Sequence, residues 1–227
     1  MAANLFRVFI TVLFIMMPMF AAAQLEVGIL GGFNFSDARI ENNSGGNIDA
    51  TGKTVYGAGV LAQYQLSENL SLGTNILYLR KAIDARNEDD IVFDIWADYI
   101  EIPLYLKYSF GNRIRPYLVF GPTLGFLLNS EVEIDLIGLP FSGDFSTVMN
   151  DLDFGVLIGA GLEIPLWSGK LFICGRYSHG FYDVLKGGTV ELKAGETLRE
   201  YATIDKGDKW FSRGTQLMAG YSWPLSF

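Results

Sequence analysis

The feature that most constrains this chain is the length of its alternating segments. In eight places apolar residues recur at every second position, which is the period of a β-strand with one apolar face. These segments cover about 25–36, 54–67, 70–82, 99–110, 115–128, 152–164, 170–185 and 216–227. They have roughly 11 to 16 residues, whereas strands of globular proteins usually have about 5 or 6. A tilted strand needs about 9 to 11 residues to cross a bilayer, so these lengths indicate strands that span a membrane.

The two faces of each segment differ in a way that favours a membrane barrel over a soluble one. In 99–110, one face carries Ile100, Ile102, Leu104, Leu106, Tyr108 and Phe110, and the other carries Tyr99, Glu101, Pro103, Tyr105, Lys107 and Ser109. A soluble lipocalin-like barrel or sandwich would expose a face rich in Lys, Glu and Thr. These second faces instead hold many glycines and isolated charges, which suit the narrow lumen of a small barrel, while bulky apolar residues suit lipid.

The connections between the segments alternate in length. Short ones lie at 68–69, 111–114 and 167–169, and long ones at 37–53, 83–94, 129–151 and 186–211. Tight periplasmic turns and longer extracellular loops are typical of up-and-down barrels, and only a closed sheet pairs every backbone group in lipid. The sequence therefore predicts an all-β fold, an eight-stranded antiparallel up-and-down transmembrane β-barrel with both termini on the short-turn side.

The N-terminal segment has the order of a secretory signal peptide. Arg7 precedes an apolar block at 8–20, and Ala21-Ala22-Ala23 follows it. We expect residues 1–23 to be cleaved and 24–227 to form the outer-membrane barrel domain; a retained membrane anchor is the alternative. The mature chain has 16 basic and 25 acidic residues, a net charge of −9 (16 − 25), because Arg7 is removed from the 17 basic residues of the whole chain. This balance argues against nucleic acid as a partner.

Five charges fall on the faces predicted to line the lumen, which makes them the candidate functional residues: Glu26, Glu101, Lys107, Glu163 and Arg176. Buried charges are normally paired, so we expect a lumenal charge network with Glu101 and Arg176 at its centre and Lys107 nearby. A structural plug that fills the barrel is favoured over a narrow charged pore. We expect no catalytic residues, cofactor or metal site, and the acidic run 88–90 lacks the spacing of a calcium loop.

Two other features have open interpretations. Ser178, His179 and Asp183 invite a hydrolase reading, since some outer-membrane barrels modify lipids, but neighbouring strand residues point to opposite faces. The segment 129–151 is too apolar for a free loop. It could extend a hairpin above the membrane, fold over the mouth of the barrel, or contact a partner.

The segments Tyr99–Lys107 (YIEIPLYLK) and Arg115–Gly125 (RPYLVFGPTLG) resemble the PorT-like outer-membrane β-barrel proteins of diderm bacteria. Gly28–Ser36, Arg176–Asp183 and the closing Phe227 are similar as well, the last resembling the aromatic residue that the barrel assembly machinery reads. The resemblance implies an outer-membrane location and, since a founding member supports protein secretion, secretion components as partners beside outer-membrane lipids and the assembly machinery.

Taken with the plug, this leads to the expectation of a non-enzymatic barrel that displays extracellular loops to partners, with a role in secretion or envelope assembly. A passive solute pore and a lipid-modifying enzyme are the alternatives.

Overall fold

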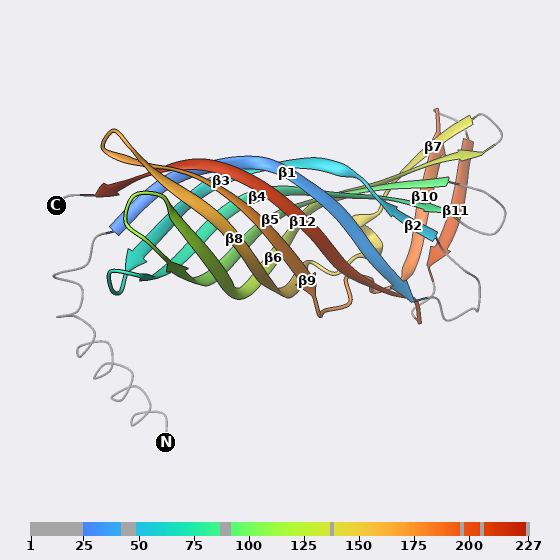
Figure 1. Ribbon diagram of the computed structural model, residues 1–227. Coiled ribbons are helices and arrows are strands. Elements are labelled where there is room, and N and C mark those ends of the chain that lie inside the picture. Colours follow the sequence, from blue (N-terminus) through green and yellow to red (C-terminus); the bar gives the residue numbers. More distant parts are fainter. Residues whose placement is uncertain are drawn as a thin grey trace, which may run out of the picture.

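The computed structural model describes residues 25–41, 49–86, 92–136, 139–195, 198–204 and 207–225. Eight of its strands close into a ring, each antiparallel to its neighbours: β1 (Leu25–Glu41), β3 (Thr54–Gln65), β4 (Leu70–Arg86), β5 (Val92–Ser109), β6 (Arg115–Leu136), β8 (Leu152–Leu166), β9 (Gly169–Gly180) and β12 (Lys209–Leu225). The first and last strands close the ring in a ladder from Leu25↔Leu225 to Glu41↔Lys209 (Figure 1). The predicted eight-stranded antiparallel barrel is confirmed.

The tight turns gather at one end of the barrel. Residues 66–69, 110–114 and 167–168 connect β3 to β4, β5 to β6 and β8 to β9, and they lie at the end where β1 begins and β12 finishes (Figure 1). Gly111 has a φ of +77°, a backbone conformation that glycine adopts without steric cost. Short turns mark the periplasmic end of such barrels, so the opposite end is extracellular.

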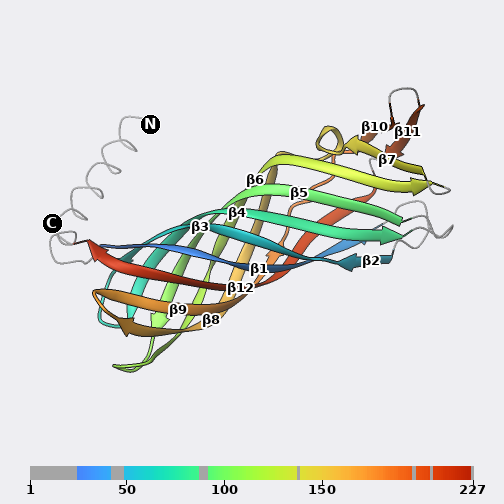
Figure 2. The ribbon, with the colours of Figure 1, turned by 90° about the horizontal axis from the view of Figure 1, so that it is seen from above.

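The four long connections were expected to be loops, and this expectation is largely wrong. The strands continue through them: β1 runs to Glu41, β4 to Arg86 and β6 to Leu136, while β5 begins at Val92 and β12 at Lys209. Strand β9 is clearly shorter than expected and ends at Gly180 rather than near residue 185, and β3 ends at Gln65, two residues early. The barrel wall therefore extends well beyond the length that a bilayer requires (Figure 2).

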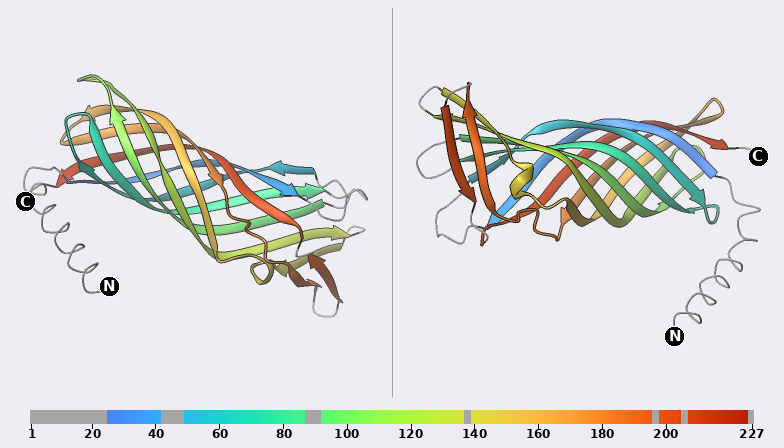
Figure 3. Two further views of the ribbon diagram at one scale, coloured as in Figure 1. Left: turned by 90° about the horizontal axis from the view of Figure 1, so that it is seen from below. Right: turned by 180° about the vertical axis from the view of Figure 1, so that it is seen from behind.

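Four further strands build the extracellular part. They are β2 (Asp49–Gly52), β7 (Leu139–Asp144), β10 (Gly188–Ala194) and β11 (Leu198–Ile204), and a short 3-10 helix, η2, covers Ser146–Val148. Strand β7 folds back on β6 as a hairpin, β10 pairs with β7, and β11 pairs with β10. These strands project from one side of the barrel (Figure 3). Of the three possibilities for 129–151, the extended hairpin is thus realised.

The outer wall of the barrel is apolar. Leu104, Phe120 and Ile158 each expose half or more of their surface, while the residues that alternate with them are mostly buried. A belt of exposed bulky side chains all round a sheet has no explanation in water, but it matches a lipid-facing surface. The assignment of the two faces of 99–110 is confirmed, and 152–164 and 216–223 show the same alternation of exposed and buried residues.

A β-bulge in β6 marks the upper limit of this belt. The β5–β6 register pairs Tyr99 with Leu127 but Asp98 with Asn129, so Leu128 is the extra residue. Below the bulge the even-numbered residues of β6 face outward, whereas above it Glu131 and Glu133 do so and the even-numbered Val132 is buried. One extra residue exchanges the faces of a strand. Here it allows an apolar outer face in lipid and an acidic one in water.

Two apolar clusters fill the interior. The first lies at mid-barrel and includes Leu61, Leu77, Tyr105, Leu157 and Met218. The second lies at the extracellular end, where Ile134 and Phe141 of the hairpin pack with Phe145, Met149, Val190 and Trp210. Within the described ranges, no helix is long and apolar enough to cross a membrane.

Three predictions fall outside the described residues. They are the signal peptide at 1–23, the acidic run at 88–90 and the terminal Phe227.

Candidate functional site

The polar residues of the lumen form the candidate site, and the first group lies near the periplasmic turns. Lys107 of β5 forms an ion pair with Glu163 of β8, and its Nζ also donates to Oε1 of Gln63 on β3 at 3.0 Å. The same Nζ lies 4.5 Å from the centre of the Tyr117 ring. Lys107 and Glu163 are 4% and 2% exposed, so the pair is screened from water. Four different strands are joined through one ammonium group.

A second ion pair lies at the same level. Glu26 of β1, which faces Gln63 across the β1–β3 ladder, pairs with Lys170 of β9. Because Lys170 follows directly on the tight turn at 167–168, its ammonium is three-quarters shielded rather than fully buried. Each of the two pairs joins one cation to one carboxylate, so the group carries no net charge.

Arg176 of β9 lies in the middle of the lumen. With the Asn75 amide oriented to suit its neighbours, Arg176 Nη1 donates to Asn75 Oδ1 at 2.9 Å, and Asn75 Nδ2 donates to Tyr105 Oη at 3.0 Å. Nε and Nη2 of Arg176 have no partner among the described residues. A cavity of about 20 Å³, room for about one water molecule, lies here between Arg176, Lys107, Tyr105 and the apolar cluster at mid-barrel.

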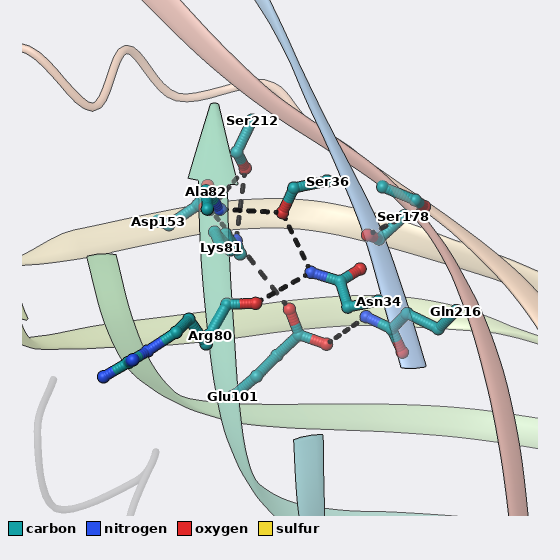
Figure 4. Close-up of polar contacts among 11 residues, drawn as sticks. Asn34, Ser36, Arg80, Lys81, Ala82, Glu101, Asp153, Ser178, Ser212 and Gln216 are labelled. Atoms are coloured by element: carbon teal, nitrogen blue, oxygen red, sulfur yellow. Dashed lines mark hydrogen bonds and ion pairs between the residues drawn. The ribbon is translucent and has the colours of Figure 1, made fainter. Parts of the chain in front are cut away.

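The third group lies toward the extracellular side (Figure 4). Lys81 of β4 is its centre: Nζ lies 2.7 Å from Asp153 Oδ2 and 3.9 Å from Glu101 Oε2, and it donates to Ser212 Oγ at 3.4 Å. Gln216 Nε2 donates to Glu101 Oε1 at 3.4 Å. Since β4, β5, β8 and β12 each supply a member, this group joins the barrel walls across the lumen.

All five predicted lumenal charges are buried, but they are not gathered as expected. Lys107 and Glu163 are brought together, while Glu26 and Glu101 find other partners. No ion pair connects Glu101 to Arg176 in the described part of the chain. Gln216 separates them, because it bonds Glu101 and lies directly opposite Arg176 in the β12–β9 ladder.

Three partners in the network were missed from the sequence: Lys81, Asp153 and Lys170. Asp153 and Lys81 both occupy alternating positions that face the lumen in their strands. This alternation was the sequence signal from which they could have been found. Lys170 opens β9 beside a turn, where alternation alone does not distinguish a lumenal residue from one that reaches water. The hydrogen-bonding residues Ser212 and Asn34 lie on strand parts that were expected to be loop or strand end.

The hydrolase candidates are not assembled into a catalytic site. Ser178 Oγ donates to the carbonyl of Gly214 at 3.4 Å. The His179 ring instead lies between the rings of Tyr177 and Phe181 on the outer face, and Asp183 accepts from the backbone N–H groups of Leu185 and Trp210, both at 3.0 Å. A nucleophile and its base must be within hydrogen-bond reach, which this arrangement does not provide.

The outer wall above the apolar belt is polar. Arg80 binds Asp98 through two bonds, Nε–Oδ1 at 2.7 Å and Nη2–Oδ2 at 2.8 Å, and this guanidinium holds the pKa of the Asp98 carboxyl below its usual range. Further out, a hollow of about 720 Å³ lies over β6, β7 and β10, with Glu131, Asp144 and Glu191 among its lining residues. This polar wall is the part of the barrel that a partner in solution would meet.

The family follows from a comparison with models of known families. The model described as outer membrane protein beta-barrel domain matches residues 19–186, which is most of the chain. The chain belongs to this family. It is accordingly an outer-membrane protein of a diderm bacterium, and its apolar outer belt agrees with a place in a membrane. No curated protein matches the sequence significantly.

One solved structure supports the same fold, and two others are similar at lower scores. A major outer membrane protein from Thermus thermophilus is 14% identical, with a TM-score of 0.54 over 90% of this chain and 100% of that one. OprG from Pseudomonas aeruginosa is 13% identical with a TM-score of 0.49, covering 89% and 96% of the two chains. Neisserial surface protein A is 13% identical with a TM-score of 0.47, covering 90% and 99%. At such low identity the likeness extends to the fold alone.

Proposed function

We propose that the protein is a non-enzymatic barrel with a plugged lumen that holds an extracellular sheet in place for partner proteins. The observation that carries the proposal is the filling of the lumen. Two groups of buried ion pairs lie on either side of an apolar cluster at mid-barrel, and a second apolar cluster lies at the extracellular end. An interior whose strands are joined by buried ion pairs suits a rigid support better than a pore. Ions passing through the lumen would have to break these pairs.

Conductance in planar bilayers tests the plug. We expect no steady current from the refolded protein. A variant in which Tyr105, Tyr117 and Phe172 are changed to Ala removes three large lumenal side chains and serves as the matched open control. Steady conductance of the unaltered chain, equal to that of the control, would favour a passive pore.

The display part of the proposal rests on the extracellular sheet. Strand β11 is at its edge, and Tyr201 and Leu198 on this strand are 67% and 51% exposed. An exposed edge strand with large apolar side chains is a usual place for a protein contact. A photoreactive residue at position 201 in intact cells should therefore capture a protein, whereas one at Ile158 on the lipid face should not.

Support of protein secretion is the specific role that we propose from the PorT-like resemblance. Cells that lack the gene should release less secreted protein, and a variant without residues 188–204 should not restore it. An unchanged secretion profile would restrict the proposal to envelope assembly. A changed lipid A profile in the same cells would instead indicate a lipid-modifying enzyme.

A further inference from the structure

Two basic side chains face outward at the upper edge of the apolar belt. Arg213 of β12 and His179 of β9 are directly opposite each other in the ladder between these strands. Arg213 and Trp223 lie on the same face of β12, ten residues apart. At about 3.3 Å per residue and a strand tilt near 40°, this spacing separates them by about 25 Å along the barrel axis. The apolar band of outer-membrane barrels is also about 25 Å tall. The pair therefore lies at the level of the outer-leaflet headgroups.

The positive charge of Arg213 is only weakly compensated. Its Nη2 lies 3.5 Å from Oδ2 of Asp37, a carboxylate whose side chain is 52% exposed, and the Arg213 side chain is itself 30% exposed. Its Nε is buried and has no partner in the part of the chain that the structure describes. Arg80, on the far side of the barrel at a similar level, differs, because Asp98 binds it twice at 2.7 and 2.8 Å. Arg213 thus keeps its charge and its terminal Nη donors for a ligand, whereas the two oxygens of Asp98 already bind Arg80.

The surroundings of His179 are those of a group that meets lipid. Its ring is stacked at 6.4 Å on Tyr177 and meets Phe181 edge-on at 5.2 Å, centre to centre. The ring packs against these two neighbours, and an imidazole carries at least one N–H donor in either protonation state. Below the pair, Leu217, Ile173 and Phe33 are 45%, 48% and 57% exposed and offer a surface for acyl chains.

We propose that Arg213 and His179 bind the phosphate group of a lipid in the outer leaflet. A guanidinium forms parallel, charge-assisted bonds to phosphate oxygens, and these are stronger at the edge of the bilayer than in water. Asp37 competes for the same guanidinium, so the lipid phosphate displaces a weak contact rather than a bidentate one. The site lies outside the lumen and is independent of the plug.

Native mass spectrometry of the full mature chain in a non-ionic, phosphate-free detergent tests the proposal. The probes are phosphorylated lipid A and the same lipid after removal of its phosphates. We expect at least tenfold tighter binding of the phosphorylated form. Arg213→Gln should remove most of this preference, His179→Gln should lower it about threefold, and Lys193→Gln, at an exposed lysine of the extracellular sheet, should leave it unchanged.

The opposite change at Asp37 distinguishes ligand binding from a structural role. Asp37→Asn should strengthen the binding of phosphorylated lipid, because it removes the competing carboxylate. Heat-modifiable gel mobility confirms that each variant is folded. Equal binding of the two lipids, or an unchanged preference in folded Arg213→Gln, would overturn the proposal. Inorganic phosphate that competes at the same concentration as the lipid would overturn the assignment to a lipid.

Discussion

Exchange of Glu163 for Gln should destabilise the barrel strongly, because it leaves the Lys107 ammonium buried without its counter-ion. Lys107 is 4% exposed, and its remaining contacts are the Gln63 carbonyl at 3.0 Å and the face of the Tyr117 ring. Neither contact neutralises a charge. Breaking a buried pair in this way typically costs about 3–5 kcal/mol. At 1.4 kcal/mol for each factor of ten, the unfolding equilibrium should shift by roughly two to four powers of ten.

Replacing both partners should cost less than replacing one. In the double variant Lys107→Met with Glu163→Leu, no charge is left uncompensated, and apolar residues of similar volume fill the space. The remaining loss is the bond accepted by Gln63, whose unsatisfied oxygen costs about 1–3 kcal/mol. We therefore expect a coupling free energy of several kcal/mol between the two positions. The exposed pair of Lys193 and Glu191, 3.5 Å apart, is the matched control and should couple by less than about 1 kcal/mol.

Urea titration in lipid vesicles, followed by tryptophan fluorescence and gel mobility of unheated samples, measures these differences. Additive losses at Lys107 and Glu163 would refute the reasoning, and so would a cost below about 1 kcal/mol for Glu163→Gln alone. Either result would mean that water reaches this level of the lumen.

Three further predictions concern the wall and the upper lumen. Leu104→Arg places a charge on the lipid face and should cost about 2–4 kcal/mol near the middle of the bilayer, measured by the same titration. Deletion of Leu128 removes the extra residue of the bulge and should abolish assembly of the extracellular wall, seen as rapid proteolysis of that part in intact cells; normal resistance would show that the bulge does not set the faces. Glu101→Ala and Arg176→Ala should each lower the melting temperature. Because no ion pair joins these two described residues and Gln216 lies between them without bonding Arg176, the two losses should add in the double variant, and a smaller combined loss would show that they interact.

The barrel itself could be predicted from the sequence because strand parity is a local property. Each of the eight ring strands contains an alternating segment longer than a bilayer needs, and the exposed surface of Leu104 and Ile158 confirms the side of the wall that meets lipid. The extension of β6 was missed because one residue changes the phase of this strand. If the alternation is continued past Leu128 without a bulge, it places Val132 and Ile134 in water and buries Glu131. The segment therefore resembled a loop rather than a strand.

The lumenal residues could be predicted for the same reason, but their pairing could not. Parity places Glu101, Lys107 and Arg176 inside, yet it says nothing of how far one strand is displaced along the next. That stagger comes from the closure of the ring and the tilt of its strands. It sets Lys107 level with Glu163, and it sets Glu101 level with Lys81 rather than with Arg176.

The two levels of charge also explain why the barrel tolerates so many buried ions. At each level, ion pairs join cations and carboxylates on strands that are not adjacent in the ring. Each such pair therefore also fixes the distance between two parts of the barrel wall. A pair within one strand would compensate charge without fixing the barrel. Removing a charge in the lumen should therefore loosen the wall on both sides of the lost contact. This property distinguishes the lumenal ions from the exposed pair of Arg199 and Glu191, whose loss affects one hairpin only.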